Sequence, residues 1–211
     1  MKDNNSKQVL LSVLGVAILV VAVVGVSFAA FSYTDTGTQV NTITTGSITM
    51  SYTEDTNGIN LTDALPMSDT EGKALTGEDN VFDFTVTASV TGNATINYAI
   101  IAAPEDSNNS NTFITDSTVK VYLTDTDDTA TGNTSDSPAV LNTLPASNTV
   151  SATTGAPNTA DDYVLANGTY SGASNSDSYR LRMWIDGSAT APTTSETYKL
   201  RVRVYGQADA Q

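Results

Sequence analysis

The feature that most constrains this chain is an apolar run from Val9 to Phe31, which contains no charged residue. As a helix with a rise of about 1.5 Å per residue it would be about 34 Å long, enough to cross the hydrocarbon core of a bilayer. Lys2 and Lys7 precede the run, and Asp35 is the first charged residue after it. Because lysines are retained on the cytoplasmic side of a membrane, the run predicts a helix that places the following residues outside the cytoplasm.

Two fates of this helix are compatible with the sequence. Ser27 and Ala29 are small residues in the positions that a signal peptidase reads, which predicts cleavage between Ala29 and Ala30. The run is longer than the apolar centre of a usual signal peptide, however, and its length suits a transmembrane anchor. Residues 1–31 are therefore predicted to be either a signal peptide or an anchor helix with a cytoplasmic N-terminus. In both cases the membrane is a partner of this helix, and the rest of the chain is extracytoplasmic, at the cell surface or secreted.

The chain contains neither cysteine nor histidine. It therefore lacks disulfides, the common zinc sites, the Ser-His-Asp triad and the Cys-His pair, so we expect no enzyme and no cofactor. A formal net charge of -14 at pH 7 repels phosphate backbones, which argues against nucleic acid as a partner. What remains is a protein that works by shape and contact.

Apolar and polar residues alternate with period two from Val81 to Val90, which predicts a strand with one buried and one solvated face. A turn at 91–94 and a second alternating stretch, Ile96 to Ala102, predict its partner in a hairpin. Further strands are predicted at 43–52, 119–123, 179–185 and 198–204, and no amphipathic helix of three turns follows residue 31. The sequence therefore predicts an all-β, antiparallel, jelly-roll-like β-sandwich preceded by one N-terminal hydrophobic helix.

The domain boundaries follow from the same pattern. Phe31 and Tyr33 alternate with polar neighbours and have no obvious hairpin mate, so residues 32–42 are predicted to be a linker or a donor strand for another copy. Residues 43–207 are predicted to form the sandwich with long polar loops, and 208–211 a tail. The low-complexity stretches between 125 and 162 are expected to be surface loops or short edge strands.

Basic residues gather on the polar faces of the last two predicted strands. Because like charges on neighbouring strands repel, this basic face requires acidic partners. Asp83 and the acidic loops of the same domain are one source, and the next subunit or an acidic wall polymer is the other. The five residues are Arg180, Arg182, Lys199, Arg201 and Arg203.

Asp125, Asp127 and Asp128 make a weak candidate for a calcium site, because alternating carboxylates can supply oxygen ligands. The spacing does not fit an EF-hand, since Ala130 stands where that loop needs glycine and Asp136 replaces its last glutamate. A solvated acidic loop explains the same residues.

The segment from Ala29 to Met50 resembles the start of the TasA and camelysin family of bacterial surface and biofilm-fibre proteins. The matching residues are Ala29, Ala30, Phe31, Ser32 and Asp35, then Asn41, Ile43, Thr44, Gly46, Ser47 and Ile48. Val81 to Ile100 is also similar to the central hairpin of that family. Tyr33 and Thr34 interrupt the family's Ser-Asp-Thr order.

The resemblance implies a jelly-roll subunit that polymerises into extracellular filaments by strand addition, with Ala30, Phe31, Tyr33 and Asp35 in the donor strand. Camelysin-like members carry a metalloprotease label, which a chain without histidine gives no reason to transfer. We therefore expect an exported structural surface protein, a filament or matrix subunit that binds copies of itself. The alternative is a membrane-anchored monomeric binding module, or a virion or S-layer surface protein, that recognises glycans or another surface through the loops at 104–112 and 124–162.

Overall fold

The computed structural model describes residues 32–35, 42–45, 48–54, 56, 59, 64–90, 94–126 and 137–210. The chain divides into two units, Met1–Phe31 and Ser32–Gln211, and all described residues belong to the second. The predicted N-terminal helix and the predicted cleavage site at Ala29 and Ala30 lie outside the described residues. Among the residues that are described, no helix is long and apolar enough to cross a membrane.

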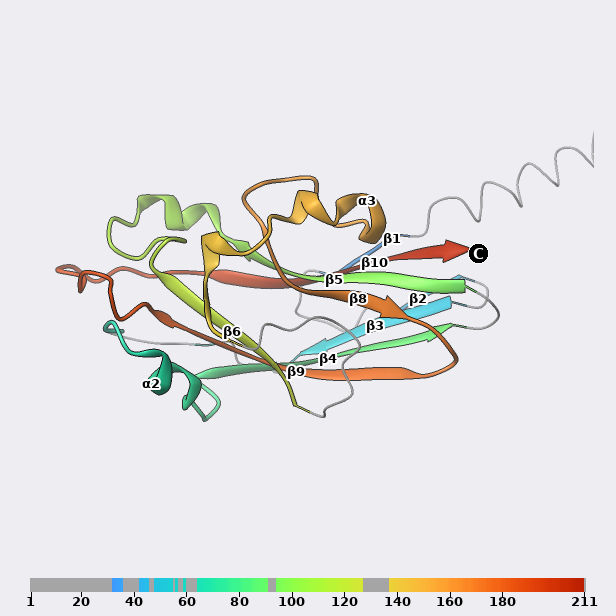
Figure 1. Ribbon diagram of the computed structural model, residues 1–211, viewed down its shortest axis with the longest axis horizontal. Coiled ribbons are helices and arrows are strands. Elements are labelled where there is room, and N and C mark those ends of the chain that lie inside the picture. The colour runs from blue at the N-terminus through green and yellow to red at the C-terminus, as the bar shows by residue number, and fades with distance from the viewer. Residues whose placement is uncertain are drawn as a thin grey trace, which may run out of the picture. The chain divides into compact units, whose positions relative to one another are not determined.

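The described chain is built mainly of antiparallel strands, as the alternating sequence predicts (Figure 1). A four-stranded sheet has the order β1-β10-β5-β8, and a six-stranded sheet has the order β2-β3-β4-β9-β6-β7. The strands are β1 Ser32–Asp35, β2 Thr42–Thr45, β3 Ile48–Glu54, β4 Val81–Val90, β5 Ala94–Pro104, β6 Val119–Asp125, β7 Ala139–Val140, β8 Tyr163–Tyr170, β9 Asn175–Ile185 and β10 Leu200–Ala210. The short helices are α2 Asp69–Lys73, η1 Asp106–Ser110, η2 Leu141–Thr143, η3 Ser147–Thr149 and α3 Ser151–Thr154.

Aromatic side chains join the two sheets in the interior. Tyr98 of β5 and Tyr179 of β9 share a hydrogen bond of 2.9 Å between their hydroxyl oxygens, so this contact crosses from the four-stranded to the six-stranded sheet. Tyr98 also stacks on Tyr170 with ring centroids 4.3 Å apart, and Phe84 stacks on Tyr179 at 5.3 Å. All four rings are buried, and buried aromatic rings contribute large apolar areas to a core.

The predicted hairpin of β4 and β5 is wrong. Both strands form, but β4 pairs with β3 and β9, whereas β5 pairs with β10 and β8 in the other sheet. The apolar faces of β4 and β5 therefore meet across the interior and do not lie side by side. Alternation with period two fixes which face of a strand is buried, and it leaves the choice of neighbour open.

The last two strands differ from the prediction in the same way, because β9 lies in the six-stranded sheet and β10 in the four-stranded sheet. The end of the chain differs as well. β10 continues to Ala210 and stays paired with β5, from Leu200 opposite Pro104 to Ala210 opposite Ala94. Residues 208–210 therefore belong to the sheet, where a tail was expected.

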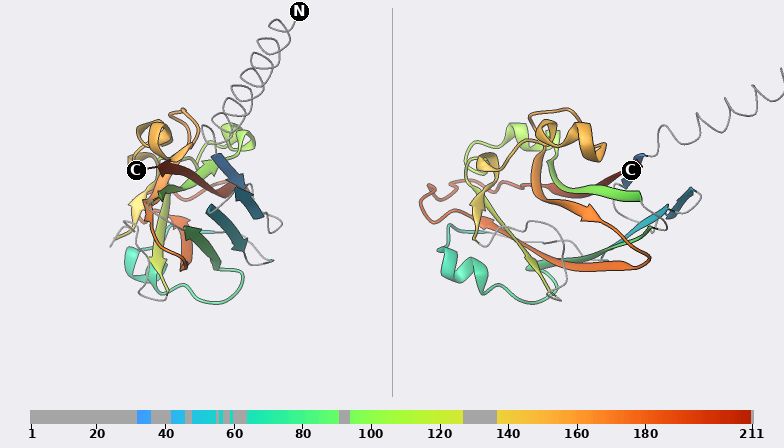
Figure 2. Two further views of the ribbon diagram at one scale, coloured as in Figure 1. Left: turned by 90° about the vertical axis from the view of Figure 1, so that its right-hand side faces the viewer. Right: turned by 45° about the vertical axis from the view of Figure 1, so that its right-hand side comes forward.

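The region 137–162 is not a simple surface loop. Helix α3 lies over the outer face of the four-stranded sheet, above β5 and β10, while η2 lies beside β6 of the other sheet (Figures 1 and 2). Ala156 packs there in one buried cluster with Ala99, Ile101, Val164 and Tyr205. Because β5 is covered on both faces, its residues from Tyr98 to Ala103 are buried without interruption.

We expect Tyr98→Phe to lower the free energy of unfolding by about 1–2 kcal/mol, because it removes a hydroxyl that meets the buried Tyr179 hydroxyl across the two sheets. Urea denaturation followed by circular dichroism measures the change. Tyr122→Phe, at a half-buried position of β6, is the matched control and should change stability by less than about 0.5 kcal/mol. Equal effects of the two substitutions would contradict a special role for the contact between the sheets.

Candidate functional site

The N-terminal strand β1 forms one edge of the four-stranded sheet. It pairs antiparallel with β10, from Ser32 opposite Gln207 to Asp35 opposite Val204. Tyr33 and Asp35 of the predicted donor strand therefore lie in a strand, while Ala30 and Phe31 lie outside the described residues. β1 has 4 residues and β10 has 11, so β1 covers only the middle of the longer strand.

The register of this pair places Tyr33 opposite Gly206. A Cβ atom on residue 206 would lie 2.4 Å from the Sδ atom of Met50 and 3.2 Å from a methyl group of Ile96. Met50 of β3 thus occupies the space that a side chain at this position would need, so any larger residue would require the Met50 side chain to move. The packing between the sheets therefore favours glycine opposite Tyr33.

The predicted basic face does not exist as one surface. Arg180 and Arg182 lie on β9, and Arg180 makes two hydrogen bonds to Asp83 of β4 at 2.7 and 2.6 Å. Arg182 donates from Nε to the Leu75 carbonyl oxygen at 2.9 Å. Burial and the neighbouring Arg180 lower the pKa of Arg182 from its usual value.

Lys199, Arg201 and Arg203 lie with β10, in the other sheet. Arg201 donates from Nε to Glu105 at 2.8 Å, Lys199 stands 4.0 Å from the same carboxylate, and Arg203 stands 3.8 Å from Asp162. The hydrogen bond from Arg201 lowers the pKa of Glu105. Acidic residues of the same domain therefore supply the partners of these three residues, as one of the two sequence-based interpretations expects, and exposed pairs such as Arg201 with Glu105 contribute little to stability.

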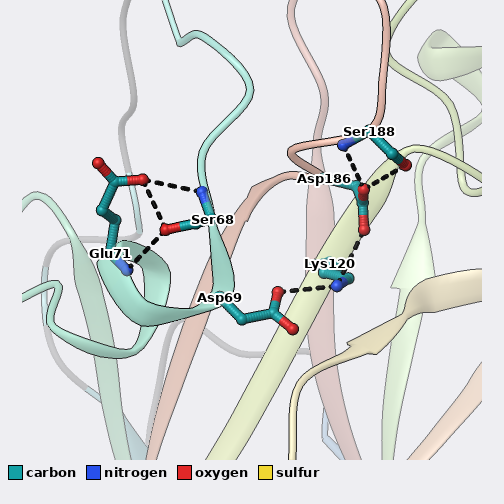
Figure 3. Close-up of polar contacts among 6 residues, drawn as sticks. All are labelled: Ser68, Asp69, Glu71, Lys120, Asp186 and Ser188. Atoms are coloured by element: carbon teal, nitrogen blue, oxygen red, sulfur yellow. Dashed lines mark hydrogen bonds and ion pairs between the residues drawn. The ribbon is translucent and has the colours of Figure 1, made fainter.

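A lysine between two aspartates fixes α2 to the six-stranded sheet (Figure 3). Lys120 of β6 contacts Asp69 of α2 at 2.7 Å and Asp186 at 2.9 Å. Asp69 raises the pKa of Lys120, and the Ser188 hydroxyl and N–H, with Lys120, lower the pKa of Asp186 to about 2. At neutral pH the lysine is a cation between anions, which suits an anchor and does not suit a nucleophile.

This cluster was not predicted from the sequence, although one part of it has a sequence signature. Ser68 and Glu71 form a capping box at the start of α2, and Ser-x-x-Glu is a known signature of a helix start. The hydrogen bond from Ser68 lowers the pKa of Glu71. Nothing in the sequence spacing connects Asp69, Lys120 and Asp186, because three separate segments supply them.

A second polar cluster fixes the connection between β9 and β10. The Glu196 carboxylate accepts hydrogen bonds from the backbone N–H groups of Thr112, Phe113 and Ile114 at 2.9, 3.0 and 2.8 Å, and from the Thr112 hydroxyl at 2.7 Å. Burial alone would raise the pKa of Glu196, but these donors lower it to about 2. The carboxylate is therefore held as an anion by the neighbouring loop.

The predicted loop at 104–112 is tied to the same connection. Asn108 is buried, donates to the Lys199 carbonyl oxygen at 2.7 Å and accepts from the Lys199 N–H at 2.8 Å. Asn111 donates to the Thr197 carbonyl oxygen at 2.9 Å. Side chains that were candidates for ligand recognition thus hold the fold together.

Nearby, Tyr163 and Tyr198 both donate their hydroxyls to Asp116, at 3.0 and 2.5 Å. Burial and Asp116 raise the pKa of Tyr163 to about 12 and raise that of Tyr198 as well. Both phenols therefore stay protonated at neutral pH and act as hydrogen-bond donors.

The weak calcium candidate is not assembled within the described part of the chain. Asp125 ends β6, while Asp127 and Asp128 lie outside the described residues. Within the ranges that the structure describes, no group of three acidic residues could hold a metal ion.

No family model, curated protein or solved structure matches this chain. Function is therefore inferred from the geometry of the described residues. Among the arrangements above, the charged and polar clusters serve the fold, and the edge formed by β1 and β10 is the one that a second molecule could use.

Stability at low pH should depend on Glu196. Its pKa is lowered from 4.5 to about 2 in the fold, so its stabilising contribution is complete above the unfolded pKa and is lost as the pH falls toward 2. We expect Glu196→Gln to lower the free energy of unfolding at neutral pH and to flatten its decrease in acid. Urea denaturation over a pH series measures both effects, and Glu78→Gln, at an exposed carboxylate, is the control. If the free energy of unfolding of Glu196→Gln fell in acid as steeply as that of the wild type, the contacts of Glu196 would not contribute to the pH dependence of stability.

Proposed function

We propose that this protein is an exported structural surface protein with a jelly-roll subunit, which assembles with copies of itself into a filament or matrix by strand addition. The observation that carries the proposal is the position of β1, a short N-terminal strand at a sheet edge that pairs with the C-terminal strand β10. The two ends of the domain thus meet in one strand pair, and that pair can form within a chain or between chains.

The β10 edge offers more backbone than β1 uses. β1 faces Val204 to Gln207, so Leu200 to Arg203 and Ala208 to Ala210 have no strand partner on that side among the described residues. Unpaired N–H and C=O groups of an edge strand are a template for another strand. A strand from a second copy that included residues next to β1 would satisfy more of these groups.

Exchange of β1 between copies replaces one set of backbone hydrogen bonds with an identical set. The free energy of the pair itself is therefore nearly the same in both arrangements, as in domain swapping. Local concentration then favours assembly, and export through one membrane provides it. Residues 36–41 connect β1 to β2 and are the part of the chain that would have to change direction.

The described surface supports contact through strand edges. Leu65 is the exposed large hydrophobic residue among the described residues. Because the described surface has no sizeable apolar patch, association of copies has to come from backbone pairing and polar contacts. This suits a protein of net charge -14, since backbone hydrogen bonds persist where surface charges repel.

One observation favours the alternative function, a membrane-anchored monomeric binding module or a virion or S-layer surface protein. In this structure β1 pairs with β10 of its own chain, so a single copy already satisfies the strand pair that assembly would use. A second observation speaks against this alternative, because side chains of the loop at 104–112, which such a module would use to bind a ligand, are hydrogen-bonded to the β9–β10 connection. The choice between the two functions depends on whether β1 pairs within or between chains.

Cysteine pairs can test the strand exchange directly, because the chain has no cysteine of its own. Ser32 and Gln207 are opposite one another in the β1–β10 pair, and the Cα atoms of such residues are about 4.5–5.5 Å apart, within disulfide range. We expect a mixture of Ser32→Cys and Gln207→Cys proteins to give disulfide-linked dimers on a non-reducing gel after assembly. A mixture of Ser32→Cys and Thr194→Cys, at an exposed loop position, is the control.

The double variant Ser32→Cys/Gln207→Cys completes the test. Strand addition predicts a ladder of covalent multimers from it. A disulfide confined to single chains, with no dimer in the mixture, would contradict the proposal and favour the monomeric module.

The N-terminus of the extracellular protein gives an independent result. A filament subunit with a free β1 segment should begin at Ala30, because cleavage after Ala29 releases the strand from the membrane. Edman sequencing or mass spectrometry of purified extracellular material measures this. Recovery of Met1 or Lys2 in assembled material would show that the helix is retained, and would favour the anchored module.

A further inference from the structure

The outer face of the six-stranded sheet has two halves of different character. The segment with α2 covers one half, where Gly72 lies against the Trp184 ring and Arg182 binds the Leu75 carbonyl oxygen. The other half, on β3, β4 and the start of β9, carries rows of hydroxyl groups that are half-buried or exposed. This hydroxyl face consists of Thr49, Ser51, Thr53, Thr85, Thr87, Ser89, Ser176 and Ser178.

The strand register aligns these hydroxyls into a regular array. Between β3 and β4, the opposite pairs are Thr49 with Ser89, Ser51 with Thr87 and Thr53 with Thr85. Between β4 and β9, they are Thr87 with Ser176 and Thr85 with Ser178. The spacing is about 4.8 Å between strands and about 6.7 Å between successive residues on one face of a strand. Several of these hydroxyls are already engaged within the fold: Ser51 meets Thr87 at 2.5 Å, Thr85 meets Ser178 at 3.1 Å, and Ser89 donates to the Ala173 carbonyl oxygen at 2.7 Å. A hydroxyl that takes part in one such bond retains acceptor capacity.

The hydroxyl face also contains a shallow depression of about 280 Å³, beside the turn between β8 and β9. Its lining comes from β3, β4 and residues 173–176, and it includes the Asn175 amide but no charged side chain. The face is thus a neutral area on a protein whose net charge is -14.

Charge and hydrogen-bonding capacity together suggest what this face can bind. Two copies of so acidic a protein repel one another wherever carboxylates face each other, and a neutral face avoids that repulsion. Each hydroxyl both donates and accepts a hydrogen bond, so an array of hydroxyls is complementary to itself. We propose that the hydroxyl face is the lateral contact through which copies in neighbouring filaments associate, an inference that rests on the proposed function.

The size of the face indicates how it would act. From Thr49 to Thr53 it spans about 13 Å along a strand and about 10 Å across three strands. The resulting area, about 130 Å², is far below the roughly 800 Å² that each partner buries in a stable protein–protein interface. One such contact does not hold two free subunits together, but the same contact repeated along two filaments gains by multivalency. The hydroxyl face should therefore bundle filaments and leave isolated subunits monomeric.

The test places one charge at the centre of the face. Thr87 lies between Ser51 and Ser176 in the register, so Thr87→Glu puts a carboxylate into the contact of both filaments. We expect filaments of this variant to stay single in electron micrographs. They should also remain in the supernatant of a low-speed centrifugation that pellets bundles. Thr87→Ser keeps the hydroxyl and should bundle like the wild type. Thr194→Glu adds the same charge at an exposed loop position and should bundle as well.

Folding of each variant is checked by its thermal unfolding curve, and Ser176→Glu, at an exposed position of the face, replaces Thr87→Glu if the latter is unfolded. Bundles of normal size in the folded charge variant would overturn the inference. Wild-type filaments that stay single alone, but sediment with a neutral polysaccharide such as dextran, would overturn it in favour of a glycan surface. Failure of the proposed function is read separately, from the disulfide between the Ser32→Cys and Gln207→Cys proteins, which reports strand exchange whether or not filaments bundle.

Discussion

Contact between the two sheets is the interaction on which the rest of this structure depends. A chain without cysteine has no disulfide to hold its layers together, so burial must do so. The rings of Phe84, Tyr98, Tyr170 and Tyr179 supply that burial, and the hydroxyl contact between Tyr98 and Tyr179 satisfies polar atoms where the sheets meet. The same contact extends to β10, because the Met50 side chain occupies the space that a Cβ atom at Gly206 would need.

Two polar clusters then hold α2 and the β9–β10 connection in place beside the sheets. Lys120 holds α2 through Asp69 and Asp186, and Glu196 holds the β9–β10 connection to residues 112–114. Both clusters keep their groups ionised at neutral pH and engage them in structural contacts. They leave the β1–β10 edge and the hydroxyl face as surfaces with hydrogen-bonding capacity, which is what the proposed contact between copies requires.

Strands and their buried faces could be predicted from the sequence, but their neighbours could not. Val81 to Val90 alternates in sequence and in burial, so its fold as a strand was readable. Its pairing with β9, about a hundred residues later, depends on contacts that alternation does not encode. For the same reason Arg180 and Arg203 were placed on one face, although they lie in different sheets. The packing of the region 137–162 was not predicted, because its buried residues, such as Leu141, Thr154 and Ala156, do not recur with a regular period in the sequence.

The segment containing β1 was predicted to be a linker or a donor strand because it had no hairpin mate, and in the structure β1 pairs with β10 of its own chain. Its partner β10 is the last of the described strands, and it is already held in the sheet by β5. Only residues 36–41 then tether β1 to β2, so pairing within the chain has a high effective concentration, and exchange with another copy requires a comparably high local concentration of copies. Four residue pairs form in either case, which keeps the two arrangements close in free energy. Under the proposed strand exchange, the local concentration of copies then decides which arrangement dominates.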